Sequence, residues 1–128
     1  MPLLEKLDIS GTTITNNILP QSAFHDKTIL KEVILPESIT TIDTYSFYNC
    51  HSLTTVNMPD SLRLINYAAF YQCYELSVSL VLPPKVNKID SYAFYRCYKI
   101  NSLTLSDSLT TFGSYAFQQC SKIGRAHV

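Results

Sequence analysis

Cysteine and histidine are the residue types in this 128-residue chain best suited to chemistry. The cysteines occur singly, 23 or 24 residues apart, at Cys50, Cys73, Cys97 and Cys120. A zinc site needs paired ligands at short spacing, such as Cys-x-x-Cys, and this spacing supplies none. His51 follows Cys50 directly, but adjacent side chains diverge, and neither His25 nor His127 has a partner pattern around it. We therefore expect no metal ion and no cofactor.

The same spacing bears on disulfides and on catalysis. Equivalent positions of stacked repeats point the same way, so their Cβ atoms stay near the strand spacing of about 4.8 Å, longer than the roughly 3.8 Å of a disulfide. We therefore expect four buried free thiols that act as small apolar residues.

No set of nucleophile, base and orienting residue can be named in this sequence, and the glycines are too isolated to form a phosphate-binding loop. The sequence favours a protein that is not an enzyme.

The elements that position these cysteines are tandem repeats. Phenylalanine recurs at intervals of 23, 23, 24 and 23 residues, at Phe24, Phe47, Phe70, Phe94 and Phe117. Each cysteine follows its phenylalanine by three residues, and Lys27 takes that position in the first repeat. A period of about 23 residues indicates a solenoid, in which one repeat forms one coil and buries its apolar side against its neighbours.

Each repeat predicts a short strand followed by a second extended stretch. The first strands cover residues 33–36, 56–59, 80–83 and 103–106, and their inward side chains alternate with outward ones. Proline ends three of them and Ser106 the fourth. The segment Ala-Phe-x-x-Cys then turns the chain back in a loop or short helical turn. An extra residue between Ser77 and Leu80 should form a bulge or looser turn, and the slack of the first repeat falls in residues 11–18.

The pattern Leu-x-x-Val-x-Met-Pro-x-x-Leu-x-x-Ile-x-x-x-Ala-Phe-x-x-Cys, from Leu53 to Cys73, resembles the BspA-like or Treponema-type leucine-rich repeat. The resemblance covers residues 28–123, with Ser106 for the proline and Ser46 for the alanine as departures. It implies one leucine-rich-repeat domain over residues 1–128, with an atypical first repeat in 1–27. The fold expected is a β-rich solenoid of the α/β horseshoe type, with about five stacked coils, parallel strands, and turns or short helices opposite. Residues 124–128 only loosely continue the repeat and are interpreted as an expression scar or read-through that does not belong to the fold.

The composition of the chain limits the kinds of partner that it could bind. Ten basic and ten acidic residues give a net charge of zero, which excludes the electrostatic attraction expected of a nucleic-acid-binding protein. No apolar run approaches the roughly 20 residues that span a bilayer, and the first residues lack the plan of a signal peptide. The family resemblance implies a cell-surface or secreted adhesin that binds host or extracellular matrix proteins.

Two surfaces are candidates for binding. The outward side of the first strands carries Glu32, Ile34, Thr55, Asn57, Ser79, Val81, Ser102 and Thr104. Eight of the nine tyrosines fall in columns around the phenylalanines, and those offered as binding residues are Tyr71, Tyr74, Tyr95 and Tyr98. Stacked tyrosines either hold the coils together or form an aromatic recognition strip. Both interpretations stay open at this stage.

The sequence thus predicts a non-catalytic protein-protein interaction module of an adhesin-like protein. The alternatives are a structural or self-associating scaffold within a larger protein and, more remotely, a carbohydrate binder that uses the tyrosine strips. A solenoid needs its terminal coils covered, so we expect either further repeats or a homodimer packed end to end.

Overall fold

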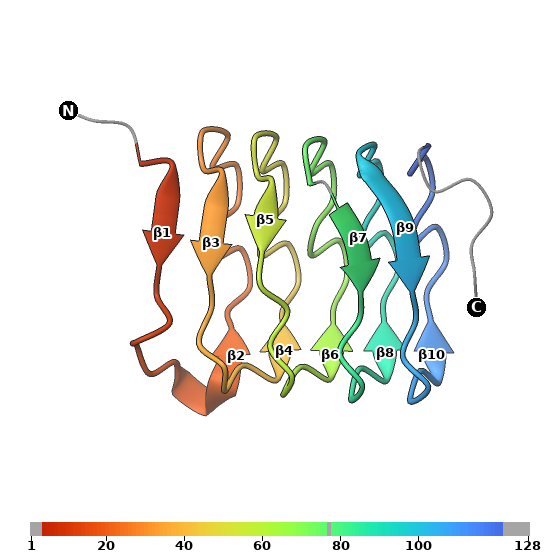
Figure 1. The fold of residues 1–128 in the computed structure, drawn as a ribbon, viewed down its shortest axis with the longest axis horizontal. Coiled ribbons are helices and arrows are strands. Elements are labelled where there is room, and N and C mark those ends of the chain that lie inside the picture. The colour runs from red at the N-terminus through yellow and green to blue at the C-terminus, as the bar shows by residue number, and fades with distance from the viewer. Residues whose placement is uncertain (1–3, 77, 122–128) are drawn as a thin grey trace.

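The computed structural model describes residues 4–76 and 78–121, which form a β-solenoid of about five coils (Figure 1). Each coil contributes two short strands. The first strands are β1 (Lys6–Asp8), β3 (Glu32–Ile34), β5 (Thr55–Val56), β7 (Val78–Val81) and β9 (Ile100–Thr104). The second strands are β2 (Ile18–Leu19), β4 (Thr41–Ile42), β6 (Leu64–Ile65), β8 (Lys88–Ile89) and β10 (Thr111–Phe112).

All strand pairs are parallel, and each strand pairs with its equivalent in a neighbouring coil. The second strands form one five-stranded sheet in the order β10-β8-β6-β4-β2, and the first strands form a three-stranded sheet, β1-β3-β5, and a pair, β7-β9. The register places Val33 opposite Val56 and Ile42 opposite Ile65, so equivalent residues form columns as predicted. The single helical element of the described residues is a 3-10 turn, η1 (Thr15–Asn17), within the predicted slack of the first repeat. Of the two options for the opposite side, turns rather than short helices are present.

The turn segment around each phenylalanine forms a third hydrogen-bonded side of the coil. Along this segment the N–H groups alternate between two roles. The Phe47 N–H donates to the Ala69 carbonyl of the next coil at 2.7 Å, whereas the Tyr48 N–H donates to the Tyr45 carbonyl of its own coil at 3.1 Å. The alternation requires a left-handed backbone two residues before and two residues after each phenylalanine, with φ from 52° at Ala68 to 63° at Gln119. The turns therefore join the coils as the strands do.

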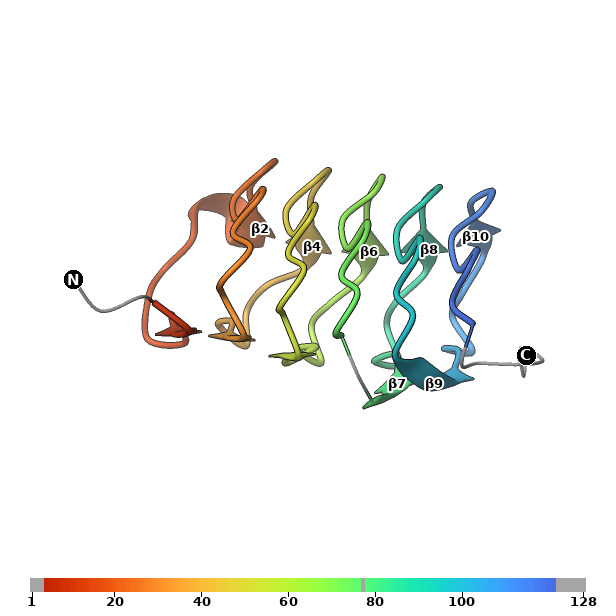
Figure 2. The same cartoon turned by 90° about the horizontal axis from the view of Figure 1, so that it is seen from above.

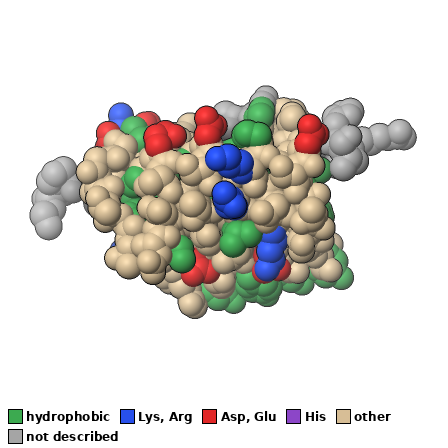
Figure 3. Space-filling view, turned by 90° about the horizontal axis from the view of Figure 1, so that it is seen from below, with side chains coloured by type: hydrophobic (Ala, Val, Ile, Leu, Met, Phe, Trp, Pro, Cys, Tyr) green, Lys and Arg blue, Asp and Glu red, His purple; other side chains and the backbone are tan. Residues whose placement is uncertain are grey.

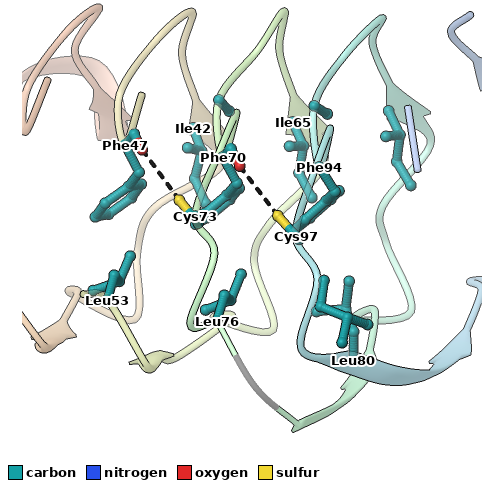
Figure 4. Close-up of a cluster of buried hydrophobic side chains, with 14 of the residues drawn as sticks. Ile42, Phe47, Leu53, Ile65, Phe70, Cys73, Leu76, Leu80, Phe94 and Cys97 are labelled. Carbon is teal, nitrogen blue, oxygen red and sulfur yellow. Dashed lines mark hydrogen bonds between the residues drawn. The ribbon is translucent and has the colours of Figure 1, made fainter. Parts of the chain in front are cut away.

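The core is built from the predicted phenylalanine and cysteine columns (Figure 4). Phe47, Phe70 and Phe94 have no exposed surface, and their rings stack in parallel with centroid distances of 4.9 and 5.0 Å. The Cys73 Sγ–H donates to the Phe47 carbonyl at 3.2 Å, and Cys97 does the same to Phe70. All four cysteines are buried and free, which agrees with the predicted thiols. Each thiol is both a small apolar residue and a hydrogen-bonded link between coils.

The extra residue of the fourth coil is absorbed by the predicted bulge. The register shifts between Val78 and Ser79, while residue 77 itself lies outside the described range. Figure 2 shows β7 and β9 displaced from the line of the earlier first strands. Because β5 and β7 do not pair as strands, the first-strand side is divided into two sheets.

The structure bears on three predictions made from the sequence: where the first strands end, how the two departures from the repeat are accommodated, and the C-terminal tail. The first strands end earlier than predicted, two or three residues before each proline, and in β3 the next free amide, Leu35 N–H, bonds to the Asn57 side chain. Both departures from the repeat pattern are compensated by hydroxyl hydrogen bonds. Ser46 Oγ donates to the Asp43 carbonyl at 2.6 Å, and Ser106 Oγ donates to the Pro84 carbonyl at 2.9 Å. The proposed tail, residues 124–128, lies outside the described residues.

Candidate functional site

The strand-face candidates are partly committed to the fold. The Asn57 side chain bonds to both backbone groups of Leu35, accepting from the N–H at 2.6 Å and donating to the carbonyl at 3.0 Å. Glu32 forms an ion pair with Lys6, with 3.5 Å between Oε1 and Nζ. Ile34 is half-buried, and the Ser79 side chain lies outside the described part of the chain. Asn57, Glu32 and Ile34 are therefore partly engaged in contacts within the solenoid.

The remaining strand-face candidates form two separate patches. Thr55 is exposed beside Glu32, and Val81 pairs in register with Thr104 on the β7-β9 sheet, next to the half-buried Ser102. Val81 is the main apolar feature, with 60% of its surface exposed. Because the strands are not paired between β5 and β7, the predicted continuous strand face is divided.

The tyrosines are brought together as predicted, on the turn side. In the Tyr48 column, defined as Tyr48, Tyr71 and Tyr95, the rings stack at 4.9 and 4.8 Å between centroids. His25 extends this column, stacking on Tyr48 at 4.9 Å. In the Tyr74 column, Tyr74 stacks on Tyr98 at 5.2 Å and on His51 at 4.5 Å. His25 and His51 thus take tyrosine positions of their columns and stack on tyrosine rings, an arrangement that was not predicted from the sequence.

A third set, the Tyr45 column, contains a residue that sequence reasoning left out. Tyr45, Tyr67, Tyr92 and Tyr115 follow one another with centroid distances of 5.7, 5.8 and 5.3 Å. Tyr67 lies three residues before its phenylalanine, whereas the other members lie two before. Ala68 holds the regular position in that coil, and the ring of Tyr67 reaches the column from the neighbouring residue. In the sequence, the alanine at position 68 beside Tyr67 was the one signal that Tyr67 replaces the missing member of the column.

The Tyr45 and Tyr48 columns lie side by side and form one surface, which we call the tyrosine face. Tyr45 meets Tyr48 edge-on at 5.2 Å, and Tyr92 meets Tyr95 edge-on at 5.3 Å. Tyr67 and Tyr115 are 39% and 54% exposed. Figure 3, in which tyrosine shares the colour of the hydrophobic side chains, shows side chains of this class gathered along the lower edge of the molecule. An aromatic surface that is half open to solvent is suited to binding another molecule.

The tyrosine face contains a cavity of about 300 Å³, lined by His25, Tyr45, Tyr48, Tyr67, Ala68 and Tyr71. The pKa of Tyr67 is raised mainly by burial. The neighbouring Tyr45 and Tyr92 and the Asp90 carboxylate raise it further. Burial and the neighbouring Tyr48 and Tyr95 raise the pKa of Tyr71. These surroundings oppose the appearance of negative charge in the cavity.

A larger hollow of about 430 Å³ lies at the first coil and is lined mainly by the end of the core, including Leu7, Phe24 and Leu30. The cysteine thiols lie buried in the core. Burial raises the pKa of Cys50 to about 12 and that of Cys97 well above its usual value. Since the thiolate is the reactive form, these cysteines are inert at neutral pH.

Comparison with known proteins shows the family. The model of the BspA type leucine rich repeat region matches residues 4–125 in six copies. The chain belongs to this family. The BspA-type repeat accounts for the phenylalanine, cysteine and proline periodicity, and confirms the resemblance inferred from the sequence. No curated protein sequence matches the chain.

Solved structures place the same repeat in longer proteins. The leucine-rich-repeat protein of Treponema pallidum is 27% identical over 94% of this chain and 57% of its own, with a TM-score of 0.85. A leucine-rich-repeat protein of Bacteroides ovatus is 30% identical over 94% of this chain and 30% of its own, with a TM-score of 0.78. A leucine-rich cell-surface protein of Faecalibacterium prausnitzii, 20% identical with a TM-score of 0.58, shares the fold over 95% of this chain and 47% of its own. The chain thus spans between about a third and somewhat over half of these proteins' lengths.

The described part of this BspA-type solenoid offers no clustered metal ligands and no membrane-spanning helix. Residues 4–76 and 78–121 contain no group of three or more histidine, cysteine, aspartate or glutamate side chains placed to hold a metal ion. Over the same ranges, no helix has the length and apolar character needed to cross a membrane. The tyrosine face and its cavity therefore remain the most developed candidate site.

Proposed function

We propose that this chain is a non-catalytic protein-binding module of a cell-surface or secreted adhesin-like protein, and that the tyrosine face makes the contact. The exposed aromatic surface of Tyr67 and Tyr115 is the observation that carries the proposal. Stacking in the core already joins the coils through Phe47, Phe70 and Phe94, so the half-open tyrosines are not needed to define the repeat. Tyrosine is enriched among residues that dominate binding energy.

The family supports a role in molecular recognition. Leucine-rich repeats are commonly protein-interaction modules, and one protein of the same fold is described as a cell-surface protein. Extracellular matrix or host proteins are the partners that the proposal names. The buried thiols belong to the core, where Cys73 donates to the Phe47 carbonyl, and this supports a structural role for them over one in thiol chemistry.

Binding of the purified chain to a panel of immobilised extracellular matrix proteins tests the proposal. The double variant Tyr67→Ser with Tyr115→Ser removes two exposed rings, and we expect it to weaken binding at least about tenfold, since interface tyrosines contribute up to several kcal/mol. The matched control is Thr55→Lys with Thr104→Lys, which changes two exposed residues of the strand face. Loss of binding in the control alone would move the contact to the strand face. Absence of binding to every panel member, with capture by a glycan array, would replace the proposal with carbohydrate recognition.

A self-associating scaffold is the second candidate, and one observation favours it. Among the described strands, β10 pairs only with β8, and Phe112 of β10 is 50% exposed. A second copy or further repeats would cover this edge. Light scattering over a concentration series distinguishes them: a homodimer should dissociate in Phe112→Lys, whereas a chain that stays monomeric at high concentration contradicts self-association.

A further inference from the structure

We propose that the cavity at Ala68 binds an arginine side chain presented by the partner protein. The inference rests on the proposed function and deepens it, because it names the group that the tyrosine face recognises. It does not follow from the repeat itself, since the cavity exists at the one regular coil in which alanine replaces the tyrosine of the Tyr45 column.

The break at Ala68 creates the space. Equivalent positions in the other regular coils are Tyr45, Tyr92 and Tyr115, and each carries its ring directly into the Tyr45 column. At Ala68 the short side chain is buried, and the ring of Tyr67 enters the column from one residue earlier. The cavity of about 300 Å³ lies at this irregular position. That volume is at the lower limit of ligand pockets and suits one amino-acid side chain.

The walls of the cavity are aromatic and differ in orientation. The Tyr45 ring is inclined by 85° to Tyr48 and by 87° to Tyr67, whereas Tyr48 and Tyr71 are close to parallel at 15°. A planar group that enters such a site meets the face of one ring and the edge of another. A guanidinium is planar and positively charged, and it binds ring faces through both stacking and the ring quadrupole.

The charges around the cavity favour a cation. None of its six lining residues is lysine or arginine, and the lining His25 is held through Nδ1 by the Asp26 carboxylate at 2.9 Å. The Asp90 carboxylate, which pairs with Lys88 at 3.6 Å, contributes to the raised pKa of Tyr67. A carboxylate or phosphate ligand would find no lysine or arginine in the lining, whereas a guanidinium would be attracted by the ring faces and by the Asp26 carboxylate.

The same aromatic column already holds a guanidinium of this chain. Arg96 lies over the Tyr95 ring with 5.2 Å from Cζ to the centroid, and its Nε donates to Gln119 Oε1 at 2.9 Å. In the coil before it, Gln72 takes the position equivalent to Arg96, so no guanidinium of the chain covers Tyr71 from that position. Both faces of Tyr71 are stacked, on Tyr48 at 4.9 Å and on Tyr95 at 4.8 Å. A guanidinium in the cavity would therefore contact the rings of Tyr45 and Tyr67, which meet each other edge-on.

Three matched peptides test the proposal: Gly-Ser-Arg-Ser-Gly, its lysine twin, and its citrulline twin, which has the shape of arginine without the charge. Each is titrated into the intact chain while NMR follows the tyrosine ring resonances. We expect the arginine peptide to shift the Tyr45, Tyr67 and Tyr71 signals and to bind at least about threefold more tightly than the citrulline peptide. The lysine peptide should fall between them, because an ammonium lacks the planar stacking surface.

Variants locate the binding. Tyr67→Ala should abolish the response, Tyr67→Phe should keep it because the ring is retained, and Tyr115→Ala should leave it unchanged because Tyr115 shares the column but does not line the cavity. No ring shifts, equal affinities for arginine and citrulline, an equal loss in Tyr115→Ala, or a stronger response to neutral oligosaccharides would each overturn the inference. If the matrix panel still binds while the peptides do not, only the arginine site fails and the proposed function stands.

Discussion

Replacing Phe70 with alanine tests the stacked core most directly. The Phe70 ring has no exposed surface and lies between two parallel rings, with centroids 4.9 Å from Phe47 and 5.0 Å from Phe94. Deleting a buried phenylalanine ring costs about 3 to 5 kcal/mol. Because two stacked contacts are lost as well, each of about 0.5 to 1.5 kcal/mol, we expect a loss in the upper half of that range, about 4 to 5 kcal/mol.

The end of the same column supplies the matched control. Phe117 is only partly buried and has one partner within the column, Phe94 at 4.9 Å, with Phe112 as a second ring at 5.6 Å. Phe117→Ala should therefore cost about half as much, roughly 2 kcal/mol. A short solenoid gains its stability from nearest-neighbour contacts, so a central coil has more to lose than a terminal one.

Urea unfolding followed by far-UV circular dichroism and tyrosine fluorescence measures both losses. Since a domain of this size has about 5 to 15 kcal/mol in total, Phe70→Ala approaches the limit of folding, and Phe70→Leu serves as the milder variant, at about 1 to 2 kcal/mol. A loss below about 1 kcal/mol in Phe70→Ala, or equal losses at positions 70 and 117, would refute the stacked column as the source of stability.

Three further outcomes follow from the structure. Burial raises the pKa of Cys50 to about 12, while an unfolded thiol ionises near pH 8.5, so the unfolded state holds fewer protons between these values. Stability should therefore fall above about pH 8.5 by roughly 1.4 kcal/mol per pH unit for each such thiol, and Cys50→Ala should flatten the slope of urea midpoints measured from pH 8 to 10. Gln72 has a φ of 59°, a left-handed conformation that strains a residue with a side chain. Gln72→Gly should therefore raise the free energy of unfolding by about 1 kcal/mol, seen as a higher thermal midpoint, and a lower midpoint would contradict the backbone strain. Asn57→Leu should lower the free energy of unfolding in urea by about 1 to 3 kcal/mol, since it leaves both backbone groups of Leu35 without their side-chain partner. An unchanged urea midpoint would show that the Asn57 side chain is available for binding.

The coil architecture was predictable because its information is periodic. A single spacing in the sequence placed the phenylalanine and cysteine columns, and it implied parallel strands and buried free thiols. Even the insertion before Leu80 was predictable, because Phe94 and Cys97 recover the phase and leave only a local bulge to absorb one residue. Packing of this kind depends on position in the repeat rather than on distant contacts.

The turn side was less predictable, because its backbone conformation does not appear in the residue types. Ten residues around the phenylalanines take φ between 52° and 63°, yet none of them is glycine, the residue usually expected there. Tyr92 and Arg96 illustrate the point, since neither residue type favours the left-handed region. The inter-coil bonds from alternate amides, such as the Phe94 N–H to the Ala116 carbonyl at 2.7 Å, hold them in it. A tertiary ladder imposes this conformation, so local sequence rules missed it.

Binding specificity in such a solenoid has to come from the irregular positions. A regular column presents the same ring at every coil, so a partner that bound it alone would fit several registers about equally well. The exchange at Tyr67 and Ala68 removes that degeneracy, because it opens a cavity at one coil and leaves the rings of Tyr92 and Tyr115 in the regular position. A partner side chain seated at Ala68 would fix the register for every other contact along the tyrosine face. Changing Ala68 to tyrosine while changing Tyr67 to alanine restores the regular column, and it should weaken binding of the matrix partner by destroying the register while preserving the number of rings. Equal affinity for the regularised chain would show that the partner reads the column and not the break in it.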